Sequence, residues 1–312
     1  MIADAELERW LAGIRTDPGP SCADIGVHAL RRGAEARARS RPPGPELPVV
    51  RDIRTHSGLR LRVYRPSLDD RPLVMYLHGG GFVIGDLDTH DAVCRRLAST
   101  GDVSVVAVDY RRAPEHPSPA AVEDAVAAFR WAMRHLPESG ASSRHGIALA
   151  GDSAGGAIAM LAAVRLVEES MLPSALFLAY PNADMTLSQP SISEKGQGWG
   201  LDEPDLAWFI EQWVPAPGDR AHPLNSPLHA TVDGLPPVVL ITAEHDPLRD
   251  EGELLAKKLR RAGVRVQHHQ ECGLVHGFFG LTHISPAAAR ATDRAFERFG
   301  TLLRGVSSEC RP

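Results

Sequence analysis

The sequence lacks long apolar runs and an excess of positive charge. None of its 312 residues belongs to an uninterrupted apolar run of about 18 residues, the length that a membrane-spanning helix needs. The formal net charge is −5 at pH 7, which differs from the strongly basic balance of most nucleic-acid-binding domains. The sequence therefore predicts neither a membrane span nor a nucleic-acid partner.

Cysteine is scarce and scattered. Cys22, Cys94, Cys272 and Cys310 form no C-x-x-C pair, the spacing typical of zinc or thiol-disulfide chemistry. The first ten residues are acidic and have neither the basic nor the apolar region of a secretory signal. We therefore expect buried or idle thiols, no metal site and a cytoplasmic protein.

Apolar patterning predicts one α/β domain. A chain of this length with 43% hydrophobic residues can bury one large core. Short apolar runs alternate with helical patterns, as in a mostly parallel sheet with helices on both faces. The expected strands are 73–77, 103–108, 147–150, 175–179, 238–242 and 264–268, and the expected helices are about 89–99, 120–135, 154–169, 250–262 and 286–303.

A hairpin and two cap segments are expected in addition to these alternating strands and helices. Residues 49–56 and 59–65 alternate in polarity and predict an antiparallel hairpin at the edge of the sheet. A helical cap is expected from two segments, because the N-terminal part is helical and Pro-rich and a later insertion is too long for a simple crossover. The expected organisation is a cap segment 1–47, core 48–183, cap insertion 184–228 and core 229–312.

A G-x-S-x-G motif lies at the centre of the chain. The run Gly151-Asp152-Ser153-Ala154-Gly155-Gly156 separates an expected strand from an Ala-rich expected helix. This strand-turn-helix context is the one in which the motif exposes a serine nucleophile. Small residues let such a crowded turn form. Ser153 is the candidate nucleophile.

A glycine loop follows the expected strand 73–77. The run His78-Gly79-Gly80-Gly81 would place backbone N–H groups at the carboxyl edge of the sheet. Preorganised N–H donors can stabilise the oxyanion of an acyl-transfer intermediate by roughly 3 kcal/mol each. A glycine loop alone also fits a simple turn or a phosphate site. Next to the serine motif it predicts an oxyanion hole made by Gly80, Gly81 and Ala154.

Three further motifs complete a family pattern. They are Tyr110-Arg111-Arg112-Ala113-Pro114-Glu115-His116-Pro117, Asp246-Pro247-Leu248-Arg249-Asp250-Glu251-Gly252 and His276-Gly277-Phe278. With the serine and glycine motifs, the chain from about 50 to 303 resembles the hormone-sensitive-lipase-like α/β-hydrolases, the bacterial family IV esterases. The resemblance implies an α/β-hydrolase fold with no cofactor, activity on short to medium acyl esters, and relatives that often form homodimers through an edge strand.

A serine hydroxyl needs a base, and fourteen histidines are available. His268 and His269 lie in or at the end of an expected strand, where their rings would point sideways or into the sheet. His276 follows that strand, after the expected turn 273–275, and a loop position lets its ring reach the serine turn. We therefore assign His276 as the base.

The acid should lie between the serine and the histidine in the chain, as in other α/β-hydrolases. Asp246 closely follows the expected strand 238–242 and fits the Asp-Pro-Leu motif of the resemblance. Asp184 follows the expected strand 175–179 and is the alternative that the residues leave open. Asp250 is expected to cap the next helix.

Four residues of these motifs are assigned supporting roles. Asp152 is expected to contact neighbouring loops, and His78 to hold the glycine loop by a hydrogen bond. Arg111 and Glu115 are expected to be structural ion-pair partners.

The sequence as a whole predicts a serine carboxylesterase that acts on small-molecule esters. Ser153 would attack the ester carbonyl, His276 would shuttle the proton and Asp246 would orient the imidazole. A deacetylase of a small natural product could use the same triad. A non-catalytic receptor for a small ligand, like the related plant gibberellin receptors, is less consistent with the sequence because those receptors lack a functional triad histidine.

Overall fold

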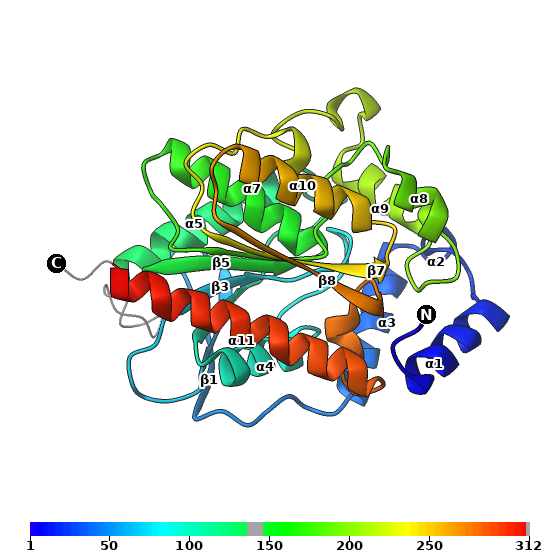
Figure 1. The fold of residues 1–312 in the computed structure, drawn as a ribbon, viewed down its shortest axis with the longest axis horizontal. Helices are drawn as coiled ribbons and strands as arrows, with labels where there is room; N and C mark the ends of the chain where they lie inside the picture. The colour runs from blue at the N-terminus through cyan, green and yellow to red at the C-terminus, as the bar shows by residue number, and fades with distance from the viewer. Residues whose placement is uncertain (136–145, 310–312) are drawn as a thin grey trace.

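The computed structural model describes residues 1–135 and 146–309, and its centre is a sheet of eight strands. The strand order is β1-β2-β4-β3-β5-β6-β7-β8, with β1 and β2 antiparallel at one edge and the other strands parallel (Figure 1). The mostly parallel sheet is therefore confirmed. The strands are β1 Val49–Arg54, β2 Arg60–Arg65, β3 Leu73–Leu77, β4 Ser104–Val108, β5 Ile147–Asp152, β6 Leu176–Ala179, β7 Val238–His245 and β8 Val266–Val275.

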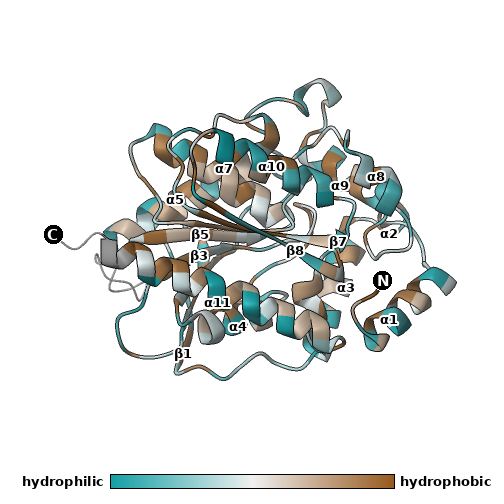
Figure 2. Cartoon of the chain, in the orientation of Figure 1, coloured by the Kyte–Doolittle hydropathy of each residue, from teal (hydrophilic) through white to brown (hydrophobic). Residues whose placement is uncertain are grey.

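Helices cover both faces of the sheet. One face packs against α5, α7 and α10, and the other against α4 and α11 (Figure 1). Figure 2 shows an apolar β5 in the middle of the sheet, a more polar edge strand β8, and helices whose outward sides carry polar residues. This layering is the one predicted from short apolar runs. The covering helices are α4 Asp91–Gly101, α5 Ala120–Arg134, α7 Ala154–Glu168, α10 Arg249–Arg261 and α11 Pro286–Glu309.

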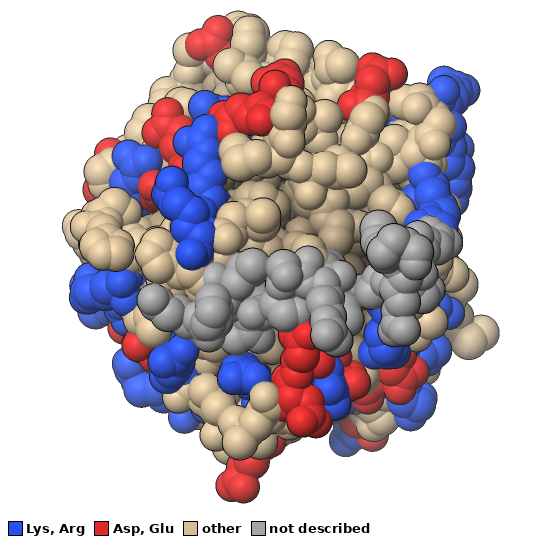
Figure 3. Space-filling view, turned by 90° about the vertical axis from the view of Figure 1, so that its left-hand side faces the viewer, with Lys and Arg blue, Asp and Glu red and all other residues tan. Residues whose placement is uncertain are grey.

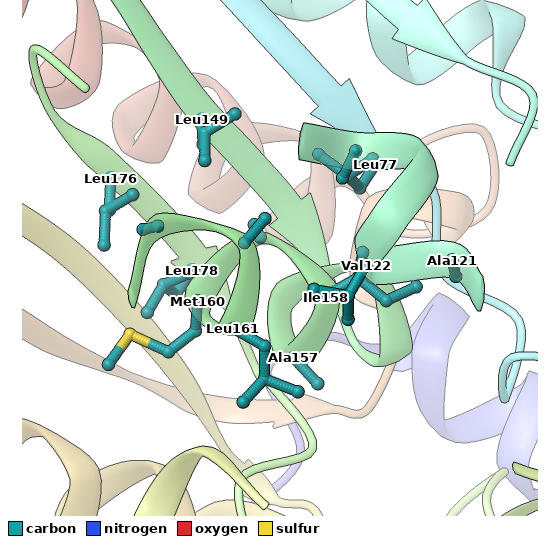
Figure 4. Packing of buried hydrophobic residues seen from close by; sticks show 14 of the residues in the cluster. Leu77, Ala121, Val122, Leu149, Ala157, Ile158, Met160, Leu161, Leu176 and Leu178 are labelled. Carbon is teal, nitrogen blue, oxygen red and sulfur yellow. The ribbon is translucent and has the colours of Figure 1, made fainter. Parts of the chain in front are cut away.

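Helix α7 lies in the middle of the larger core. Its Ile158 and Leu161 side chains belong to the same buried cluster as Leu149 and Leu178 of the sheet (Figure 4). α7 packs against β3, β5 and β6 and against α5, and most of its residues are buried. Many alanines let its neighbours approach closely. The packing fixes the start of α7, directly after Ser153.

The N-terminal segment and the insertion contact each other at one end of the sheet (Figure 1). Arg15 Nε donates to the Gly198 carbonyl at 2.9 Å, and its guanidinium lies 4.7 Å from the centre of the Trp199 ring. The Cys22 N–H donates to Asp205 Oδ1 at 2.7 Å. The helices of these segments are α1 Ala5–Thr16, α2 Cys22–Ile25, α3 Val27–Ser40, α8 Pro190–Lys195 and α9 Glu203–Trp213.

The last strand differs most from its expected range. β8 runs over Val266–Val275 instead of 264–268, so the turn predicted at 273–275 is wrong. β8 is an edge strand, and the polar residues Gln270 and Glu271 continue it while still pairing with β7. Because these residues are polar, the apolar run ended too early to predict the full strand.

The surface charges, the helices and the thiols can be compared with the sequence predictions of no nucleic-acid partner, no membrane span and buried or idle thiols. On the face shown in Figure 3, Lys and Arg side chains lie near Asp and Glu side chains. No helix in the described parts of the chain is both long and apolar enough to cross a bilayer. Cys22, Cys94 and Cys272 are free thiols, of which Cys94 is buried, and Cys310 lies outside the described residues.

We predict that Gly155→Ala destabilises the fold by about 2 kcal/mol or more, as overpacking does. A Cβ at this position would lie 2.0 Å from the Leu77 carbonyl oxygen, so α7 would have to move away from β3. Gly218→Ala is the matched control because an added Cβ there meets no atom within 4 Å, and we expect a change below about 1 kcal/mol. Urea unfolding of both variants measures the difference, and equal stabilities would contradict the packing argument.

Candidate active site

Ser153 lies on a strained turn between β5 and α7. Its φ of 54° and ψ of −122° are rare for a residue with a side chain. The backbone around it is packed too closely for side chains. A Cβ on Gly151 would lie 2.2 Å from the Gly155 carbonyl oxygen. Larger side chains would therefore clash with the backbone of the turn, so the motif needs its small residues, as the sequence predicted.

The structure brings Ser153, His276 and Asp246 together in one chain of hydrogen bonds. His276 Nε2 lies 2.8 Å from Ser153 Oγ, and His276 Nδ1 lies 2.9 Å from Asp246 Oδ2. The Asp246 carboxylate is fully buried, and its other oxygen accepts the Leu248 N–H at 2.8 Å. The three side chains follow β5, β7 and β8, so they meet at the carboxyl edge of the sheet.

The alternative acid is engaged elsewhere. One carboxylate oxygen of Asp184 accepts from the Thr186 N–H and hydroxyl, and the other accepts from Ser188 and Gln189. These bonds close a local turn after β6. The structure thus pairs His276 with Asp246 and not with Asp184.

The expected helix cap at Asp250 is wrong. α10 begins at Arg249 after an N-cap at Leu248, and no side chain caps it. Asp250 instead accepts the Ser191 N–H at 2.9 Å. The helix starts early because Asp246 closes the preceding turn through its bond to Leu248.

The rejected histidines lie within β8, as expected. His268 Nε2 contacts Thr242 Oγ1 on the neighbouring strand at 3.0 Å. Burial lowers the pKa of both His268 and His269, with nearby arginines adding to the effect. Neither ring contacts Ser153.

The glycine loop lies beside the serine. Gly80 and Gly81 have φ values of 120° and 58° and line the same cavity as Ser153. A Cβ on Gly81 would lie 2.4 Å from the Phe209 ring, so the loop has no room for a side chain there. Ala154 is the first residue of α7, and the first N–H groups of a helix have no partner within it. The three residues predicted to form the oxyanion hole therefore lie beside Ser153.

A buried polar cluster holds the glycine loop. Asp152 Oδ1 accepts the Gly79 N–H at 2.9 Å and the Tyr76 hydroxyl at 2.7 Å. His78 Nδ1 donates to the Gly79 carbonyl at 2.8 Å, and the Tyr110 hydroxyl donates to the His78 carbonyl at 2.7 Å. These bonds confirm the supporting roles expected for Asp152 and His78.

The two expected ion-pair residues are also confirmed. Arg111 pairs with Asp124 at 2.9 Å. Glu115 pairs with Arg31 of α3 at 2.7 Å, and this hydrogen bond lowers the pKa of Glu115 to about 2. Arg31 also donates to the Val83 carbonyl at 2.8 Å, so it ties α3 to the loops beside the serine. No motif near Arg31 in the sequence predicted this role.

A cavity of about 350 Å³ opens above Ser153, a volume in the range of small-molecule sites. Its walls come from the core and from both expected cap segments. Side chains that the sequence did not single out line it as well, namely Trp10, Arg37, Arg41, His90, Asn182 and Leu201. Within the described ranges, no group of three or more His, Cys, Asp or Glu side chains could hold a metal ion.

Comparison with known proteins agrees with this geometry. The family model described as the alpha/beta hydrolase fold matches residues 74–280. Esterase LipI of Mycobacterium tuberculosis is 40% identical over 293 residues, which cover 90% of each chain. The chain belongs to the hormone-sensitive-lipase-like esterases of the α/β-hydrolase superfamily.

Two further relatives are similar to this family IV esterase. Carboxylic ester hydrolase LipN of M. tuberculosis is 41% identical over 276 residues, covering 85% of this chain and 73% of LipN. The structure of a hyperthermophilic esterase from the archaeon Pyrobaculum calidifontis matches with a TM-score of 0.86 and 35% identity. That match covers 98% of this chain and 99% of the archaeal chain.

The buried His78 has a consequence for stability. Burial, with His90 beside it, lowers the pKa of His78 to about 3. An unfolded histidine has a pKa of about 6.5. As the pH falls below that value, the unfolded chain binds a proton that the folded chain does not, so this residue makes folding less favourable toward acid pH.

We predict that the His78 ring signals in NMR spectra stay those of the neutral form from pH 8 to pH 5. In urea unfolding, His78→Gln should make the loss of stability between pH 7 and 5 smaller by up to about 2 kcal/mol, the linkage expected from the lowered pKa. A ring that titrates between pH 8 and 5 would contradict this assignment.

Proposed function

We propose that this family IV esterase is a serine carboxylesterase that hydrolyses small-molecule esters with short to medium acyl chains. The observation that carries the proposal is the chain of hydrogen bonds from Ser153 through His276 to the buried Asp246, at the cavity of about 350 Å³. Two relatives named as an esterase and a carboxylic ester hydrolase support the same reaction.

The reaction begins with proton transfer. His276 Nε2 takes the proton of Ser153 as the serine oxygen attacks the ester carbonyl carbon. The carbonyl oxygen becomes negatively charged, and the N–H groups of Gly80, Gly81 and Ala154 stabilise it. When the intermediate collapses, His276 gives the proton to the departing alcohol and an acyl-enzyme remains.

The second half of the reaction uses the same groups. His276 takes a proton from water, the hydroxide attacks the acyl-enzyme, and the carboxylic acid leaves as Ser153 recovers its proton. Asp246 accepts the Nδ1–H of His276, which leaves Nε2 free to act as the base. The Tyr180 ring packs edge-on against the imidazole at 4.9 Å and limits its rotation.

The cavity walls set the substrate range. We assign residues 1–47 and 184–228 to one cap, because Trp10 comes from the first segment and Phe209 from the second, and both line the cavity. The small volume favours short acyl groups over long lipid chains. The hydrogen bond between His276 and Ser153 favours catalysis over a receptor that only binds its ligand.

We predict that Ser153→Ala lowers kcat/KM for p-nitrophenyl butyrate by at least about 10⁴-fold, because no other group can form the acyl-enzyme. His268→Ala, a histidine change in β8, should leave the rate within about twofold. Release of p-nitrophenol followed by absorbance measures both. Residual activity of Ser153→Ala close to the wild-type rate would mean that another residue is the nucleophile.

We predict that Asp246→Asn lowers kcat on the order of 10³- to 10⁴-fold, because an amide no longer selects the required imidazole tautomer. Asp184→Asn changes a carboxylate that is also buried but bonds the turn after β6 and lies 3.6 Å from His229 Nε2, and it should cost less than tenfold. Steady-state kinetics of the two variants shows which aspartate orients the imidazole. A larger loss in Asp184→Asn would make Asp184 the acid.

A further inference from the structure

Two arginines line the cavity that contains Ser153. Arg37 lies in the last turn of α3 and Arg41 directly follows the helix. Residues four apart lie on the same side of a helix, so both side chains reach the same wall. Arg41 also lies against the segment after the histidine, since a Cβ added to Gly280 would lie 3.5 Å from its Nη1 atom.

Neither of these arginines is neutralised by the protein. Across residues 1–135 and 146–309, no carboxylate forms an ion pair with Arg37 or Arg41, whereas Arg31 and Arg39 of the same helix pair with Glu115 and Glu35. Like charges four residues apart repel each other. Burial and the neighbouring Arg37 lower the pKa of Arg41, which reflects the same unfavourable arrangement.

Asp152 also lines the cavity, but within the described residues its carboxylate forms no ion pair with either arginine. Asp152 uses Oδ1 to bind the Gly79 N–H and the Tyr76 hydroxyl, and His90 lies 3.7 Å away. It therefore serves the glycine loop. A cavity with a nucleophile and two unpaired guanidinium groups is suited to a substrate that brings its own negative charge.

We propose that Arg37 and Arg41 form an anion subsite, and that the esters hydrolysed at Ser153 carry a carboxylate group on their acyl or alcohol part. This inference rests on the proposed esterase function and names its substrate class. The planar guanidinium group can donate two parallel N–H bonds to a carboxylate. The apolar Ile84, Leu206 and Phe209 line the same cavity and would contact the uncharged part of the substrate.

Paired substrates test the subsite on both parts of the ester. The first pair is p-nitrophenyl hemiglutarate and p-nitrophenyl valerate, whose acyl chains have the same length but differ in a terminal carboxylate. The second pair is 4-acetoxybenzoate and phenyl acetate, which places the charge on the alcohol part. For each pair the ratio of kcat/KM for the anionic ester to that for the neutral ester is measured in the wild type and in Arg37→Gln, Arg41→Gln and the double variant.

We predict that the double variant lowers this ratio at least about tenfold for one of the two pairs, mainly through KM, because charge-assisted hydrogen bonds to the substrate are lost. The pair that responds shows which part of the ester carries the charge. Arg32→Gln is the matched control, because Arg32 is an exposed arginine of α3 outside the cavity wall, and its ratios should equal those of the wild type.

Unchanged ratios for both pairs in the double variant would overturn the subsite, and so would an equal fall in Arg32→Gln. Failure of the wild type to hydrolyse the neutral esters would count against the proposed esterase function instead. Calorimetric titration with glutarate then tests the subsite alone. Binding to the wild type that is lost in the double variant supports it, and equal or absent binding in both overturns it.

Discussion

The close contact between the start of α7 and the end of β3 determines how the site is built. A Cβ on Gly155 would lie 2.0 Å from the Leu77 carbonyl oxygen and 2.5 Å from that of His78. The strand that leads into the glycine loop and the helix that follows Ser153 therefore touch through their backbones. This contact fixes Ser153 relative to the glycine loop, and the strained backbone of Ser153 is part of the same arrangement.

The positions of Asp246 and His276 relative to Ser153 depend on the order of the parallel strands. β6 and β7 follow β5 in the sheet, and β8 lies at the edge. The bond from the Leu248 N–H, just before α10, holds the Asp246 carboxylate in place 2.9 Å from His276 Nδ1. Arg31 links the N-terminal segment to the core through Glu115. This link holds α3 on the core, and Arg37 and Arg41 line the same cavity as Ser153.

Short motifs were sufficient to predict those parts of the site that a few consecutive residues form. The serine turn, the glycine loop and the order of Ser153, Asp246 and His276 were predictable, because the carboxyl ends of parallel strands meet at one edge. The Asp-Pro-Leu motif of the resemblance favoured Asp246 over Asp184, and the structure adds the physical reason, since the turn that binds the Asp184 carboxylate is not visible in the residue pattern. The length of β8 was missed because polar residues continue an edge strand. The positions of Arg37 and Arg41 depend on how α3 packs on the core, and no local sequence pattern predicts that packing.

We propose Ser153 as the group that forms the acyl-enzyme. Reaction with diethyl p-nitrophenyl phosphate, followed by mass spectrometry of the intact protein and of its peptides, identifies the residue that the reagent labels. We expect one diethylphosphoryl group per chain on the peptide that contains Ser153, formed in proportion to the loss of esterase activity. Loss of activity with the adduct on another residue, or full activity after complete labelling of Ser153, would contradict it.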